Sequence, residues 1–152
     1  MKKHLGFSVV FLLIAGCLGV MAQKPGSKYK PPKLITQLGT AKDSVALSPE
    51  EIGKLVAMPL VITDAAGGKY EISTYQLAYK RMAYVEDEET GKVSPANSVV
   101  AELFRQTPLS KIWIIQIQDQ IHQGESLIFF DVFVKDAKGR ILKAPDLKLV
   151  AQ

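Results

Sequence analysis

The clearest pattern of apolar and polar positions along the chain indicates strands after residue 58. Residues 59–64 (PLVITD) and 69–85 (KYEISTYQLAYKRMAYV) are rich in β-branched and aromatic residues, and Ala65–Gly68 between them is typical of a turn. Residues 127–134 (LIFFDVFV) indicate a further strand, and Asp136–Gly139 after it is typical of a tight turn, in which Asp bonds the backbone and Gly takes a positive φ. The chain is therefore predicted to hold a hairpin with a long or bent second strand, and another hairpin near its end.

One acid interrupts the apolar strand 127–134. Regular alternation places Asp131 on the same face as Phe129 and Phe133, and the other face then holds Phe130, Val132 and Val134. Asp119 or Glu125 could form a carboxylate pair with Asp131. For an acid among aromatic rings, however, we expect a structural partner such as a lysine or a backbone amide, and not general acid–base work.

Two segments predict helices. The first begins at Ser48, a favourable N-cap, followed by Pro49 at the first helical position and by Glu50–Glu51 near the positive end of the helix dipole. Gly53 and Pro59 limit this helix to about two turns.

The second predicted helix has Ser110 as its N-cap and apolar residues at helical steps between Trp113 and Ile121. Gly124 is the expected left-handed stop. The apolar run 112–117 would also suit a buried strand, but the many polar residues between 116 and 123 favour a helix. Residues 98–106 (SVVAELFRQ) fit a short helix or a strand, and periodicity over nine residues does not decide between them.

The N-terminus has the parts of a secretory signal peptide, predicted over residues 1–22. Lys2 and Lys3 precede an apolar run that is shorter than the roughly 20 residues of a membrane-spanning helix. Two cleavage sites compete. Ala22–Gln23 fits ordinary signal peptidase, whereas Ile14–Cys17 resembles a lipobox, in which Cys17 is the site of lipid attachment. The expected locations are the periplasm, or the outer membrane as an anchored lipoprotein.

Charge separates the next segment from the rest of the chain. Residues 23–33 (QKPGSKYKPPK) are basic, rich in proline and predicted to form an extended tether. Six lysines precede residue 34, which leaves thirteen basic and fifteen acidic residues in positions 34–152. This body has no basic excess with which to neutralise phosphates, so nucleic acid is not an expected partner.

No combination of residues indicates catalysis, a metal site or a cofactor site. Cys17 is the only cysteine, and His122 is the only histidine after the signal. No Gly-x-Ser-x-Gly elbow or glycine-rich phosphate loop is present, and the acidic run 86–89 lacks the ligand spacing of a calcium loop, so we expect a solvated loop there. The chain is therefore predicted not to be an enzyme.

The pair Gly124–Glu125, then Phe129, Val132 and the turn Asp136–Gly139, resembles the C-terminal domain of the GldM family of gliding-motility proteins. The similarity covers about 40 residues, 109–149, and departs at 137–138, where the family often has Pro-Asp and this chain has Ala-Lys. The resemblance implies a strand at 98–106 and a role beside the gliding and type IX secretion machinery of Bacteroidetes. GldM itself is long, membrane-anchored and multi-domain, so this chain looks like one terminal domain exported alone.

Together these features predict one β-rich domain over residues 34–152, mainly β in the α+β class, with an antiparallel β-sandwich-like sheet and one or two short helices. We expect a non-catalytic protein–protein interaction module that binds another envelope protein through exposed apolar residues or an open sheet edge. The alternatives are a purely structural envelope protein and a small-molecule or glycan binder that uses Tyr75, Tyr79, Tyr84 and Trp113.

Overall fold

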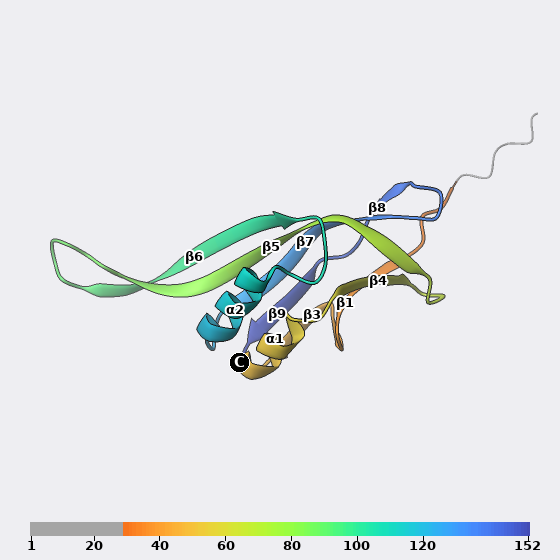
Figure 1. Ribbon diagram of the computed structural model, residues 1–152. Helices are drawn as coiled ribbons and strands as arrows, with labels where there is room; N and C mark the ends of the chain where they lie inside the picture. Colours follow the sequence, from red (N-terminus) through yellow and green to blue (C-terminus); the bar gives the residue numbers. More distant parts are fainter. Residues whose placement is uncertain (1–28) are drawn as a thin grey trace, which may run out of the picture. The chain divides into compact units, whose positions relative to one another are not determined.

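Strands dominate the computed structural model, which describes residues 29–152 (Figure 1). In chain order, its elements are β1 (Leu34–Leu38), β2 (Ala41–Lys42), β3 (Ser44–Leu47), α1 (Pro49–Leu55), β4 (Leu60–Asp64), β5 (Lys69–Glu86), β6 (Val93–Phe104), α2 (Lys111–Gln120), β7 (Ser126–Lys135), β8 (Ile141–Lys143) and β9 (Leu147–Ala151). The predicted signal peptide, Cys17 and residues 23–28 of the predicted tether lie outside the described residues.

The sheet is mixed and nearly closed into a barrel, so the predicted antiparallel sandwich is wrong in this respect. Its order is β2-β1-β4-β5-β7-β9-β3, with β6 added on β5 and β8 on β7. The pairs are antiparallel except β3 with β9, which run parallel from Ser44 beside Lys148 to Leu47 beside Ala151. Because β3 follows β2 after one residue, this pairing brings the two ends of the sheet close together. The coarser prediction, mainly β with two short helices, is confirmed.

Helix α1 begins where its cap predicts. The Ser48 hydroxyl accepts a hydrogen bond from the Glu51 backbone N–H, and the Glu51 carboxylate accepts one from the Ser48 N–H, which completes a capping box. Pro49 occupies the first helical position as predicted, and the helix ends at Leu55, which agrees with the predicted length of about two turns.

Helix α2 confirms the helical interpretation of the apolar run 112–117 and begins after Ser110 as predicted, but its other end differs from the prediction. Ser110 lies at the N-cap position without a side-chain cap hydrogen bond. At the other end the helix stops at Gln120, and Ile121 is already extended. Gly124 has a positive φ of 89° in the turn that follows, so it shapes the turn and does not end the helix itself.

The long strand β5 carries the centre of the hydrophobic core. Tyr75, Leu77 and Tyr79 are fully buried on one of its faces. The Tyr75 ring stacks on Phe104 from β6 with centroids 5.4 Å apart, and Phe104 meets Trp113 of α2 edge to face at 5.9 Å. The aromatic residues therefore bind helix α2 to the junction of β5 and β6. The segment 98–104 is a strand, which settles the ambiguity of the sequence pattern.

A bulge in β7 makes the predicted alternation wrong. The register between β5 and β7 shifts on both sides of Thr74, and Asp131 has a φ of 47°. Phe129 is therefore buried with Val132 and Val134, whereas Asp131 and its neighbouring phenylalanines, Phe130 and Phe133, are only half-buried. The Asp131 carboxylate accepts a hydrogen bond from Lys143 at 2.7 Å, so the predicted lysine partner is confirmed.

The two predicted turns share one geometry. Asp64 accepts the backbone N–H of Ala66 and of Gly68, and Asp136 accepts those of Lys138 and of Arg140. The glycine three residues after each aspartate has a positive φ, 83° at Gly67 and 75° at Gly139. These aspartate contacts lower the pKa of Asp64, through the Gly68 N–H above all.

Candidate functional site

The most exposed part of the β-sheet is the end of the β5–β6 hairpin. Strand β7 pairs with β5 only as far as Lys80, whereas β6 continues along β5 to the pair Glu86 and Val93. Residues 81–98 therefore form a two-stranded ribbon, here named the arm, which projects past helix α2 in Figure 1. A ribbon of this kind buries little surface of its own, since it lacks a third strand.

Apolar side chains are exposed on both faces of the arm. Tyr84 is 70% exposed, and Met82, Val85 and Val93 are each about half exposed. Tyr84 and Val85 are neighbours on one strand, so they point to opposite faces. Neither face of the arm is thus a buried core face, and contiguous apolar exposure of this kind is typical of interaction surfaces.

Strand β6 also has an open edge. Among the described strands it pairs with β5 alone, and every residue of β6 except Ala96 and Phe104 is exposed. Val99, Val100 and Leu103 are between 42% and 59% exposed. Unpaired backbone N–H and C=O groups along such an edge can pair with a strand of another chain.

A buried carboxylate holds the arm where it leaves the body. Glu125 is only 4% exposed, and it accepts hydrogen bonds from the Tyr79 hydroxyl at 2.6 Å, the His122 N–H at 3.0 Å and the Met82 N–H at 3.1 Å. Burial and this carboxylate raise the pKa of the Tyr79 hydroxyl well above its ordinary value. Three donors around one acid make a structural clamp, since both of its oxygens accept hydrogen bonds.

A cavity of about 420 Å³ lies beside this clamp, lined by Met82, Tyr84, His122, Gln123 and Glu125. It opens where the exposed Tyr84 ring of the arm faces the turn that follows α2. The His122 ring is exposed and its Nδ1 lies 2.6 Å from the Gln120 carbonyl oxygen. The cavity therefore offers an apolar and aromatic wall for a partner side chain.

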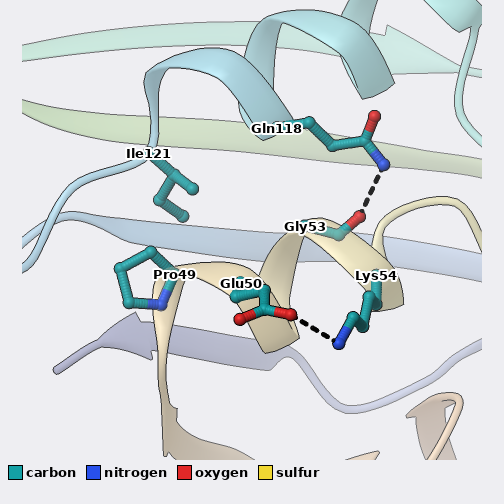
Figure 2. Close-up of a pocket in the computed structure, with 6 residues that line it drawn as sticks. All are labelled: Pro49, Glu50, Gly53, Lys54, Gln118 and Ile121. Carbon is teal, nitrogen blue, oxygen red and sulfur yellow. Dashed lines mark hydrogen bonds and ion pairs between the residues drawn. The ribbon is translucent and has the colours of Figure 1, made fainter.

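A second cavity, of about 380 Å³, lies between α1 and α2 (Figure 2). Its polar groups bond to one another: Lys54 pairs with Glu50 at 2.7 Å, and the Gln118 side chain donates to the Gly53 carbonyl oxygen at 2.8 Å. Figure 2 shows Gln118 reaching from α2 to the backbone of α1. The Gln118 contact joins the two helices, whereas the Lys54–Glu50 pair lies within α1, so these polar groups already have partners in the protein.

Of the four aromatic residues considered for a ligand pocket, three belong to the core and one lies on the arm. Tyr75, Tyr79 and Trp113 are buried between sheet and helix, and only Tyr84 is exposed. The Tyr75 hydroxyl donates to the Gln106 carbonyl oxygen at 3.0 Å, and burial raises its pKa to about 12. The Trp113 indole N–H donates to Glu102. These polar tips thus have partners within the protein.

The acidic turn at the tip of the arm is exposed, and Asp87 organises it. Its Oδ1 accepts the backbone N–H of Glu89 and of Thr90, and the Thr90 hydroxyl, which lowers the Asp87 pKa. Within residues 29–152, no group of three or more His, Cys, Asp or Glu side chains could hold a metal ion. In the same part of the chain, no helix is long and apolar enough to cross a membrane.

Sequence reasoning did not single out the arm or the clamp. A signal for the arm and the adjoining part of β6 does exist: Met82 to Val85 and Val99–Val100 place apolar residues at both parities, with an acidic turn between the two strands. No protein-family model matches the chain, and no curated protein is significantly similar to it. The arm and the open edge of β6 therefore stand out by their geometry alone.

Proposed function

We propose that this chain is an exported, non-catalytic protein-binding module of the bacterial envelope, and that its binding surface is the arm with the open edge of β6. The observation that carries the proposal is the edge itself, twelve residues long and exposed at ten of them. Edge strands of soluble proteins are commonly short, charged or covered, because an open apolar edge pairs with other chains. A binding role would explain why this chain has a long, open and apolar edge strand.

The export part of the proposal rests on the sequence. The signal-peptide pattern of residues 1–22 supports secretion, and Cys17 in its lipobox-like context supports an outer-membrane anchor. The resemblance of residues 109–149 to the GldM C-terminal domain makes the gliding and type IX secretion machinery the first set of partners to test.

Site-specific photo-crosslinking in the native envelope tests the binding surface. A photoreactive amino acid at Val99 is expected to give a defined adduct with an envelope protein, identified by mass spectrometry. The matched control is the same amino acid at Ile141, which is 54% exposed in strand β8 at another place on the sheet. Equal adducts from both positions, or none from Val99, would contradict the proposal.

A shortened arm provides the second test. Ala83 and Ala96 are direct cross-strand partners, so an Asn-Gly turn can join them in place of Tyr84–Pro95. The body is expected to stay folded, because the Glu125 clamp and the aromatic core lie outside the deleted segment. Loss of the envelope adduct, with circular dichroism unchanged, supports the arm as part of the surface. Gene deletion should then impair secretion or gliding.

A further inference from the structure

We propose that the strand that pairs with the open edge of β6 is the β6 strand of a second copy of this chain, in antiparallel orientation about a two-fold axis at Val100. This inference rests on the proposed function and names the partner of that edge. It follows from where proline and the charges lie along β6, and from which orientation separates the acidic turns.

Proline sets the limits of the pairing. Pro95 lacks a backbone N–H, so it interrupts an edge ladder at that position. The stretch without proline runs from Ala96 to the end of the strand at Phe104, and its middle residue is Val100. Two such stretches in full antiparallel overlap pair Val100 with itself, which is the geometry that a two-fold axis requires.

The side chains in this register are compatible. Val99 lies opposite Ala101 of the other copy, and Leu103 lies opposite Asn97. Glu102 is the only charged residue of β6, and it faces Ser98 of the other copy while its carboxylate accepts the Trp113 N–H. No like charges meet across the pair, a condition that favours adjacent strands.

Long-range charge favours the antiparallel orientation. The acidic turn 86–89 lies beyond the start of β6, and two exposed cations, Arg105 and Lys111, lie just after its end. Antiparallel pairing directs the acidic turn of each copy toward the Arg105 and Lys111 end of the other. Parallel pairing would instead bring the two acidic turns together, so charge complementarity selects one orientation.

Closure gives a physical reason for a second copy. A two-fold pair uses the same edge of both chains, so residues 96–104 of both β6 edges are paired and assembly stops at two. The sheets would then be continuous from β7 and β5 of one copy, through both β6 strands, to β5 and β7 of the other. The outer face of the arms and the cavity beside Tyr84 remain accessible to an envelope partner.

Sedimentation of the full chain, purified from the cells that produce it, tests the inference. The chain is expected to be a dimer whose dissociation constant rises roughly tenfold or more in Val99→Lys, because an edge lysine opposes strand pairing in both halves of the interface. Ile141→Lys, with a matched exposure in β8, is expected to leave the constant unchanged. Equal effects of the two variants would overturn the inference.

Cysteine crosslinking tests the register. In Val100→Cys the two new side chains lie opposite each other, with Cα atoms about 4.5–5.5 Å apart, which is within the Cα separation of about 4.4–6.8 Å that a disulfide spans. Mild oxidation should give a disulfide-linked dimer that the parent chain, whose single cysteine is Cys17, does not form. A chain that stays monomeric, yet crosslinks from Val99 to a different envelope protein, overturns the second copy and leaves the proposed function standing.

Discussion

The Glu125 clamp allows the sharpest prediction, which is that Glu125→Gln destabilises the protein by about 2 kcal/mol. One carboxylate oxygen, Oε2, accepts both the Tyr79 hydroxyl and the His122 N–H, and the other, Oε1, accepts the Met82 N–H. Glutamine has a single acceptor oxygen. If that oxygen stays with the Tyr79 hydroxyl and the His122 N–H, the new amide NH₂ group faces the Met82 N–H. Two donors then face each other, and the Met82 N–H loses its acceptor.

The magnitude follows from these contacts. One buried backbone donor left without an acceptor costs about 1–3 kcal/mol, and each of the two remaining bonds loses about 1 kcal/mol when its acceptor becomes neutral. A neutral amide is less costly to bury than a carboxylate, which offsets part of the loss. A net cost of about 2 kcal/mol remains.

Urea unfolding followed by Trp113 fluorescence measures the change, since this is the only tryptophan of the chain. Glu71→Gln is the matched control, because Glu71 is exposed on the same strand as Tyr79 and should shift the midpoint little. In a double-mutant cycle with Tyr79→Phe, the combined cost should be smaller than the sum, because Glu125→Gln weakens the same hydrogen bond that Tyr79→Phe removes. Superimposable curves for the Glu125 and Glu71 variants would refute the clamp.

Three further predictions follow from local geometry. Ser48→Ala should lower the free energy of unfolding in urea by about 1 kcal/mol because it removes a capping hydrogen bond. Ser110 makes no such bond, so Ser110→Ala should lower the free energy little. Equal losses of stability would contradict this prediction. Gly39→Ala should lower the melting temperature more than Gly67→Ala. Both sites have a positive φ, but a Cβ at Gly39 would lie 2.6 Å from a leucine side chain, whereas the space at Gly67 is open. A larger decrease for Gly67→Ala would contradict this prediction. The pKa of Tyr75 is about 12 in the folded protein against about 10 when unfolded, so it gives stability that is present below pH 10 and lost as pH rises toward 12. Tyr75→Phe should therefore lose less stability than the parent chain over that pH range, in alkaline unfolding followed by circular dichroism. An unchanged loss of stability would exclude this cause.

Local chemistry explains which parts of the fold could be predicted from the sequence. The start of α1 was predictable because Ser48, Pro49 and Glu51 act within one turn of chain. The turns at Asp64 and Asp136 were predictable for the same reason.

The features that sequence reasoning missed depend on distant segments. The near-closure of the barrel comes from the parallel pairing of β3 with β9, whose residues are about a hundred positions apart, and no periodicity encodes that pairing. The bulge at Asp131 is a matter of register between β7 and β5. Glutamate is usually exposed at the protein surface, so the sequence gives no sign that Glu125 is buried. It is buried because the end of β5 and the turn after α2 bring three donors to it.

The pair Gly124–Glu125 connects the family resemblance with the proposed binding surface. Glu125 accepts the N–H of Met82, one of the first residues of the arm, and Gly124 has a positive φ and a bare Cα where a Cβ would lie 2.7 Å from the Met82 sulfur. Both residues also bond the backbone of Ala151 at the end of β9. The pair therefore joins the root of the arm to the last strand of the body. Since β5 runs without interruption from the core into the arm, this junction sets the direction of the arm, and the proposed binding surface is oriented by the folded body before any partner binds.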